Sequence, residues 1–151
     1  MTRLNVVVEG PTEVLFVNEV LSLHLQPRGV FLSARAVFTS NRSGAIHRGG
    51  ATYFSRIHQD ISTWCKQDPT AKVTSMFDLY ALPPDFPRYE RALKEKNPYD
   101  RVRVLEKGFA ASIGCSNFIP YLQLHEFEAL LFTQIERLSA SFRRAAVDRN
   151  Q

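Results

Sequence analysis

The sequence has little cysteine and no long apolar run. Its two cysteines, Cys65 and Cys115, are too few for the disulfide framework of a small secreted protein. No run of about 18 apolar residues occurs, so no membrane-spanning helix is predicted. The N-terminus also lacks the charged, apolar and small-residue regions of a signal peptide. We therefore expect a cytoplasmic protein with reduced thiols.

Three common catalytic signatures are missing as well. The segment "GPTEVLF" lacks the Gly-Lys-Ser/Thr ending of a P-loop. The segment "HEFEA" is not the His-Glu-x-x-His helix of zinc enzymes, and no Cys-x-x-Cys pair exists. No Gly-x-Ser-x-Gly elbow occurs. The sequence thus offers no support for P-loop, zinc or serine-triad chemistry.

The composition is that of an ordinary globular domain. The chain has 151 residues, of which 44% are hydrophobic and 23% charged, and this length fits one compact domain. The net charge is +4 and the pI about 9.3. This mildly basic balance permits a polyanionic partner, but an evenly charged surface with a few extra arginines explains it equally well.

Strand-like and helix-like segments alternate along the chain. Short apolar segments predict strands over residues 4–8, 30–39, 72–77 and 117–124, and Pro120 favours an edge position or a bulge for the last. Helical spacing and capping residues predict helices over residues 12–25, 51–67, 89–96 and 98–113, and a last helix of about twenty residues from 125. The alternation predicts an α/β fold with a four-stranded parallel sheet and helices on both faces. We expect one domain over residues 1–138 and a basic tail over 139–151.

Acidic residues stand where the predicted strands end. Glu9 follows the first strand, and Glu13 lies on the first turn of the helix after that strand. Asp78 ends the third strand, and Glu126 and Glu128 follow the fourth. The carboxyl ends of parallel strands share one edge, where ligands bind in open α/β sheets. Carboxylates gathered there repel one another without a cation. Mg²⁺ suits such oxygen ligands, and a pair of such ions can cleave phosphodiesters.

Each of these acids also has an ordinary explanation when taken alone. Glu9 could pair with an arginine, and Glu13 and Glu126 could be acids favoured by a helix N-terminus. Asp78 could be a turn residue or a helix cap. Their shared location, rather than any one residue, favours a metal site.

Basic residues and a histidine flank the predicted edge. The loop "TSNRSGAIHRGG" holds Arg42, His47 and Arg48 among glycines, which suits phosphate contact but also an ordinary surface loop. His125 lies beside the acids and could be a general base, a phosphate contact or a structural hydrogen-bond partner.

Other basic residues have a simpler interpretation. Arg101, Arg103 and Lys107 on the helix that starts at residue 98 are interpreted as a solvated face. The basic stretch over residues 137–149 is interpreted in the same way, although it could grip nucleic acid or a partner.

The segments "VEGPTE", "MFDLY" and "YLQLHEFEALLF" together carry a resemblance that covers residues 3 to about 132. The sequence resembles the Toprim superfamily, its OLD-like nuclease branch in particular, and more specifically the bacterial domain-of-unknown-function family numbered 4276. The resemblance implies a Toprim-like, Rossmann-like four-stranded parallel sheet. The family's glutamates after strand one fall on Glu9 and Glu13, and its aspartate after strand three falls on Asp78.

The sequence departs from the Toprim pattern at Tyr80, where Toprim domains usually carry a second aspartate. A second metal would therefore need Asp85, Glu126 or Glu128 as a ligand, and the resemblance at the end of strand four favours Glu126 and Glu128. The chain also stops soon after the last motif helix, where relatives continue, which fits either a natural truncation or a shortened sequence.

The resemblance implies an endonuclease that cuts or nicks DNA with Mg²⁺ or Mn²⁺. Related OLD-like proteins often act in defence against phage or mobile elements, beside an ABC-type or AAA-type ATPase, which here would be a separate partner. The expected catalytic residues are the acids Glu9, Glu13, Asp78 and Glu126, together with His125. The expected metal ligands are the same four acids and Glu128. The sequence is also compatible with a homo-oligomer. The alternatives are a non-catalytic Toprim module that binds metal, nucleotide or an ATPase and regulates it, and an RNA-directed nuclease.

Overall fold

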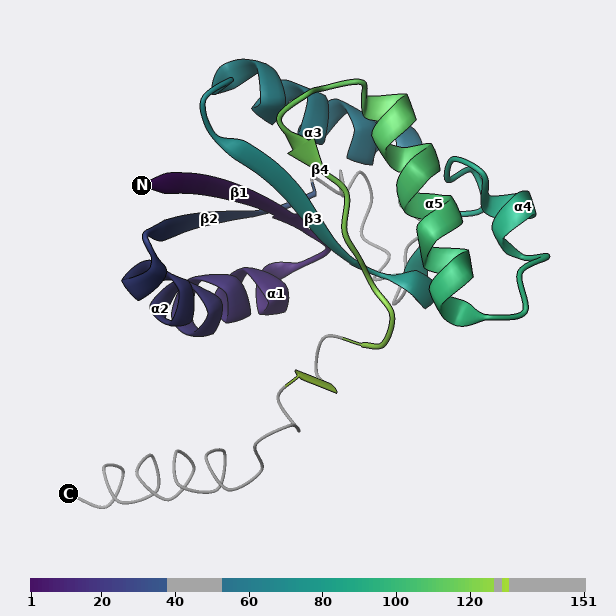
Figure 1. The fold of residues 1–151 in the computed structure, drawn as a ribbon, viewed down its shortest axis with the longest axis horizontal. Coiled ribbons are helices and arrows are strands. Elements are labelled where there is room, and N and C mark those ends of the chain that lie inside the picture. The colour runs from purple at the N-terminus through teal and green to yellow at the C-terminus, as the bar shows by residue number, and fades with distance from the viewer. Residues whose placement is uncertain (38–52, 127–128, 131–151) are drawn as a thin grey trace, which may run out of the picture.

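A computed structural model of the chain describes residues 1–37, 53–126 and 129–130. These residues build a parallel sheet with helices on both faces (Figure 1). The strands are β1 (Thr2–Val8), β2 (Val30–Ala36), β3 (Lys72–Asp78), β4 (Phe118–Ile119) and β5 (Leu122–Gln123). Their order is β2-β1-β3-β4, with β5 also paired to β3, and every pairing is parallel. The Rossmann-like α/β class is confirmed, with five strands rather than the four expected.

The helices follow the predicted alternation. After β1, the helix α1 (Pro11–Phe16), the π-helical turn η1 (Val17–Leu21) and α2 (Ser22–Leu25) run on without a break, and the 3₁₀ turn η2 (Gln26–Arg28) follows. The remaining elements are α3 (Phe54–Gln67), the 3₁₀ turn η3 (Leu79–Ala81), α4 (Tyr89–Ala92) and α5 (Pro98–Ile113). None of the helices within the described residues is long and apolar enough to cross a membrane.

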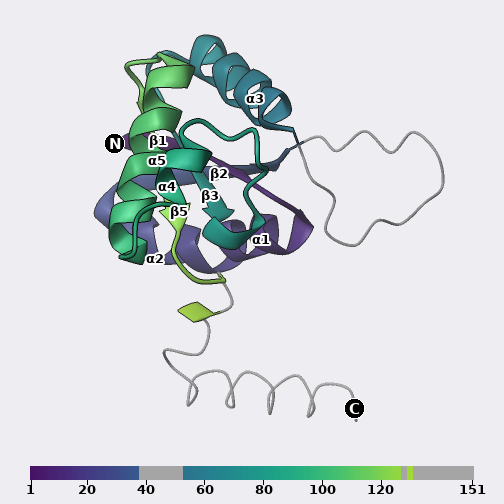
Figure 2. The ribbon, with the colours of Figure 1, turned by 90° about the vertical axis from the view of Figure 1, so that its right-hand side faces the viewer.

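The alternation of side chains along β1 builds a core on each face of the sheet. Val7 packs into the larger cluster, which includes Ile61 of α3 and Phe109 of α5. Val6 and Val8 point the other way and pack with Val17 and Met76 under the helical segment after β1. Figures 1 and 2 show this segment on one face and α3 with α5 on the other. The period of two in a strand is therefore what separates the two cores.

Aromatic rings fix α5 above the sheet. Phe109 is fully buried, and its ring meets those of Phe86 and Phe118 edge to face with centroids 4.9 Å apart in each case. Such pairs contribute about 0.5–1.5 kcal/mol beyond the area they bury. Because Phe118 begins β4, this contact holds the edge of the sheet against α5.

The predicted fourth strand is interrupted. Residues 117–124 form two short strands, β4 and β5, with Pro120 and Tyr121 between them. Proline cannot donate to the ladder. Hydrogen bonds between the buried Ser75 of β3 and the Tyr121 backbone replace the strand pairing here. The Ser75 hydroxyl donates to the Tyr121 carbonyl at 2.7 Å, and the Tyr121 N–H donates to Ser75 Oγ at 3.3 Å. Of the edge position or bulge predicted from Pro120, the edge position is confirmed, since β4 stands last in the strand order.

Two predicted helices have different outcomes. The helix predicted over residues 89–96 is wrong in length, because α4 ends at Ala92 and bonds of the i to i−3 type follow, such as Glu95 N–H to Ala92 carbonyl at 3.1 Å. The next helix, α5, agrees with prediction. The Asn97 side chain caps it by accepting from the Tyr99 N–H at 2.9 Å, and Gly114 ends it at a φ of 66°, a conformation that glycine adopts without strain.

Two predicted segments lie largely outside the described residues. These are the loop over residues 40–50 and most of the helix expected from 125 onwards, of which 129–130 are described as helical.

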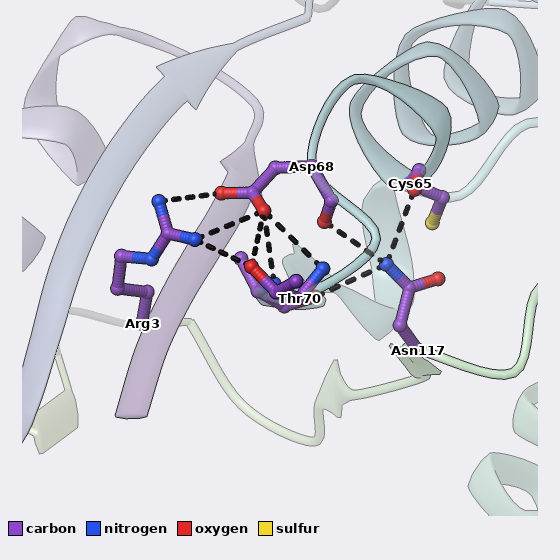
Figure 3. Close-up of polar contacts among 6 residues, drawn as sticks. Arg3, Cys65, Asp68, Thr70 and Asn117 are labelled. Carbon is purple, nitrogen blue, oxygen red and sulfur yellow. Dashed lines mark hydrogen bonds and ion pairs between the residues drawn. The ribbon is translucent and has the colours of Figure 1, made fainter. Parts of the chain in front are cut away.

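A polar cluster closes the end of the sheet opposite the strands' carboxyl ends (Figure 3). Arg3 forms an ion pair with Asp68 at 2.7 Å, and Asp68 accepts from Thr70 O–H at 2.7 Å. The Thr70 hydrogen bond, followed by the Arg3 charge, holds the pKa of Asp68 below its usual value. The cluster ties β1 to the turn between α3 and β3.

The two cysteines lie near this cluster and are free thiols. Burial, followed by a hydrogen bond with Cys115, raises the pKa of Cys65 to about 12. Since the thiolate is the reactive form, Cys65 is a structural residue of the core.

Candidate functional site

Two of the predicted acids, Glu9 and Asp78, meet at the carboxyl edge of the sheet. β1 and β3 are neighbours in parallel register, with Val8 opposite Met76. Glu9 therefore leaves β1 beside the last residue of β3, and its Oε1 accepts a hydrogen bond from the Asp78 N–H at 2.8 Å. Asp78 is buried, with 8% of its surface exposed, whereas Glu9 is exposed. The edge thus holds one buried and one exposed carboxylate.

Glu13 lies one turn further on and reaches back toward this edge. It is on the first turn of α1 and half-buried. A Cβ placed on Gly10 would lie 3.3 Å from Glu13 Oε2, so the carboxylate lies close over the backbone that links β1 to α1. Pro11 stands at the start of α1, where its missing N–H costs nothing. This short turn brings the second glutamate near the first.

The predicted residues after the fourth strand are more open. His125 and Glu126 are exposed, and the Glu126 carbonyl accepts from the Ala129 N–H at 2.9 Å. Glu128 and the predicted phosphate contacts Arg42, His47 and Arg48 lie outside the described residues. Within residues 1–37, 53–126 and 129–130, no three His, Cys, Asp or Glu side chains form a group that could hold a metal ion.

Two further positions concern the second acid of the Toprim pattern. Tyr80 lies on η3 with 69% of its surface exposed. Asp85, which could have replaced that acid, accepts from the Phe54 N–H with both oxygens at 3.1 Å. Asp85 therefore serves the N-terminus of α3, where a carboxylate satisfies open backbone donors.

Sequence reasoning missed a second polar group at the same edge. Gln123 is buried and pairs in register with Asp78, and the Tyr121 hydroxyl donates to its Oε1. Burial, and then the charges of Glu106 and Asp78, raise the pKa of Tyr121. Burial also raises the pKa of Glu106, whose Oε1 accepts from the Leu122 N–H at 3.0 Å.

The signal for this group was weak in the sequence. Gln123 is an uncharged residue inside a strand, and Glu106 lies in the middle of a helix, sixteen residues before Leu122. Gln123 comes to the edge through the pairing of β5 with β3, and Glu106 through its hydrogen bond to the Leu122 N–H of β5. The available signal was the amide of Gln123 near the end of the last predicted strand, because amides also offer oxygen to cations.

The chemistry of the edge fits a hard divalent cation. Glu9, Glu13 and Asp78 offer carboxylate oxygens, and Gln123 offers an amide oxygen nearby. Oxygen ligands of this kind suit Mg²⁺, Ca²⁺ and Mn²⁺ rather than softer metals. Because fewer than three acids converge among the described residues, a complete site would need Glu13 or Glu126 to turn toward Glu9 and Asp78.

Comparison with known proteins gives one finding for the chain as a whole. The family model described as "Domain of unknown function (DUF4276)" matches residues 8–150. The match includes every acid of the predicted site. No curated protein and no solved structure matches the chain.

Proposed function

The chain belongs to the DUF4276 family, and on that premise we propose that it is a Toprim-type, metal-dependent phosphodiesterase that cuts or nicks DNA. One observation carries the proposal. Two neighbouring parallel strands bring Glu9 and Asp78 to the same edge, where the Glu9 carboxylate is held by the Asp78 N–H at 2.8 Å. Rigid strands position such groups more precisely than loops do.

The acids of this edge would hold the cation. Glu9, Glu13 and Asp78 are the proposed ligands of Mg²⁺ or Mn²⁺, with Glu126 and Glu128 in support. A bound cation supplies Lewis-acid activation of water and neutralises charge on a phosphate. The Asp78 N–H restricts the orientation of the Glu9 carboxylate, which lowers the entropy lost when a ligand binds.

Proton transfer and phosphate contact are assigned to residues around the acids. His125, exposed after β5, is proposed to take or deliver a proton, a role for which the imidazole group is suited near neutral pH. Arg42, His47 and Arg48 are proposed to contact phosphate, because they follow β2, which ends at the same edge as β1. Arginine pairs with phosphate oxygens through two N–H groups at once.

The biological setting is proposed from the Toprim and OLD-like resemblance alone. It favours defence against phage or mobile elements in the cytoplasm, with a separate ABC-type or AAA-type ATPase as the partner. The net charge of +4 is compatible with DNA as the substrate.

A second candidate is favoured by a specific observation. The described residues gather no group of three metal-binding side chains, and an exposed tyrosine, Tyr80, stands at the second acidic position. A non-catalytic module that binds an ATPase or a nucleotide and regulates the partner would need no complete metal site. The affinity of such a module for its ATPase or nucleotide would be unchanged in Glu9→Ala.

Plasmid nicking with Mg²⁺ or Mn²⁺ tests the proposal. Wild type is compared with Glu9→Gln and Asp78→Asn, with Glu19→Gln as the control because Glu19 is an exposed acid further along the same helical segment. We expect nicking that EDTA abolishes and that each edge variant lowers at least 100-fold, since loss of even an outer-shell partner costs about 10–100-fold.

Circular dichroism verifies that each variant is folded. Nicking that survives in both edge variants would refute the proposed site. A wild type that neither nicks nor gains thermal stability from either metal would support the regulatory alternative, because a ligand bound to the folded state alone must raise stability.

A further inference from the structure

A pocket of about 170 Å³ adjoins the acidic edge. Leu79, Tyr80, Tyr89, Leu93, Arg101 and Leu124 are among its lining residues. Leu79 and Tyr80 directly follow Asp78, and Leu124 directly precedes His125. The pocket therefore lies between η3, α4, α5 and the end of β5, and Figures 1 and 2 show α4 lying against α5.

Arg101, one of the lining residues, has a buried N–H group without an acceptor among the described residues. Its Nη2 donates to the Glu95 carbonyl at 3.1 Å, but its Nε is buried and has no hydrogen-bond partner in the described part of the chain. Arg101 and Arg103 were both expected on a solvated face. This holds for Arg103, an exposed partner of Asp100 at 3.3 Å, but not for the buried Nε of Arg101. A buried donor left unpaired is costly, more so on a charged group, and Arg101 lines the pocket, so a ligand with an acceptor to which the guanidinium turns would relieve this cost.

The size of the pocket limits the ligand to about one ring. A cavity of about 150 Å³ binds benzene, whereas drug-sized ligands occupy about 300–1,000 Å³. Tyr80 and Tyr89 provide aromatic surfaces, and the leucines provide apolar walls. The matching ligand is a flat ring with apolar faces and a nitrogen or oxygen acceptor on its edge, which describes a nucleobase.

The charge around the pocket indicates that this ring is carried by a polyanion. Residues 88–107, which supply α4 and most of α5, contain seven Lys or Arg and four Asp or Glu, a net charge of +3. A basic surface beside aromatic side chains is the usual arrangement for single-stranded nucleic acid.

We propose that the pocket receives one unstacked base of the DNA strand whose phosphate lies at the acidic edge. Tyr80 stacks on the base, and Arg101 Nε–H donates to a ring oxygen or nitrogen. The inference rests on the proposed function for the identity of its substrate. The base contact itself involves no metal ligand and is measurable without cleavage.

Fluorescence anisotropy in EDTA tests the pocket apart from the chemistry. One labelled probe is a twelve-nucleotide thymidine strand, and the other has the same number of phosphates but abasic sugars. Wild type should bind the thymidine strand more tightly than the abasic strand. Tyr80→Ala should weaken thymidine binding by roughly 5- to 140-fold, the equivalent of one stacked base, and leave abasic binding unchanged.

Two further variants separate the contacts. Arg101→Lys keeps the charge but removes the Nε–H group, so it should weaken thymidine binding at least about fivefold and abasic binding less than about twofold. Tyr99→Ala is the matched control, because Tyr99 is an exposed tyrosine of α5, with 64% of its surface exposed, and is not among the lining residues. It should change neither affinity.

Equal affinity of wild type for the two strands, or no binding to either, would overturn the base pocket. Equal effects of Tyr80→Ala and Tyr99→Ala would do the same. The two proposals fail separately. If Asp78→Asn abolishes nicking and the strands still bind equally, the nuclease proposal is supported and the base pocket is refuted. If wild type discriminates between the strands but neither nicks nor gains thermal stability from metal, the base pocket is supported and the nuclease proposal gives way to the regulatory alternative.

Discussion

Replacing Asn117 with alanine tests how the interrupted last strand is held beside β3. Asn117 is 9% exposed, and its Nδ2 lies 3.2, 3.4 and 3.1 Å from the carbonyl oxygens of Cys65, Asp68 and Ala71 (Figure 3). Its own carbonyl accepts from the Val73 N–H at 2.9 Å. One side chain therefore joins the end of α3 and the start of β3 to the start of β4.

The structure sets the size of the effect. An amide has two N–H groups, so the three carbonyls share two donors. Alanine removes about two hydrogen bonds, each worth about 1 kcal/mol net, and leaving a buried acceptor unsatisfied costs about 1–3 kcal/mol. We expect the free energy of unfolding to fall by about 2–4 kcal/mol. In a domain of about this length each kcal/mol shifts Tm by about 2–4 °C, so Tm should fall by about 4–16 °C.

Thermal and urea unfolding followed by circular dichroism measure this loss. Asn97→Ala is the matched control, because the exposed Asn97 makes one cap bond, to the Tyr99 N–H at 2.9 Å, and such caps contribute about 1 kcal/mol. Equal losses for the two variants would refute the reasoning. Asn117→Asp should be worse than alanine at pH 7, since a carboxylate would face three carbonyls; a harmless Asn117→Asp would mean that the amide is turned the other way.

Two further predictions concern α5. Burial raises the pKa of Glu106 above its usual 4.5, so the stability that the protonated group contributes is present below pH 4.5 and is lost as the pH rises through the raised value. Glu106→Gln keeps an acceptor for the Leu122 N–H and should be more stable than wild type at pH 7 but not at pH 4; equal unfolding midpoints at pH 7 would contradict this. Gly108→Ala should lower stability by about 1–3 kcal/mol despite the better helix propensity of alanine, because its Cβ would lie 2.8 Å from the Pro87 carbonyl oxygen and 2.9 Å from Arg88 Cγ. Lys107→Ala, on the exposed side of the same turn, is its control and should stay within about 0.5 kcal/mol, and a stabilising Gly108→Ala would refute the contact.

The local elements of the fold could be predicted from the sequence because their causes are local. The run of valines that forms β1 and the apolar segment of β3 both ended where expected, at the acids that close them. Asn97, Pro98 and Gly114 correctly marked the two ends of α5, since a cap, a first-turn proline and a left-handed glycine act within a few residues of the chain. Pro120 correctly favoured an edge position, because a residue without an N–H is tolerated best where no further strand needs that donor.

The sequence alone also determined which acids stand at strand ends, and hence the candidates for a metal site. It could not determine which acids meet. Glu9 reaches the Asp78 N–H because β1 and β3 are neighbours in register, and strand order depends on how distant segments pack.

The remaining features of the site were decided by tertiary structure for the same reason. Glu106 reaches the edge through its hydrogen bond to the Leu122 N–H and Gln123 through the pairing of β5 with β3, while the Arg101 guanidinium is held by the Glu95 carbonyl just beyond α4. Spacing along the chain reports which face of an element a residue occupies. The element that covers that face is chosen by non-local packing, which the local sequence pattern does not encode.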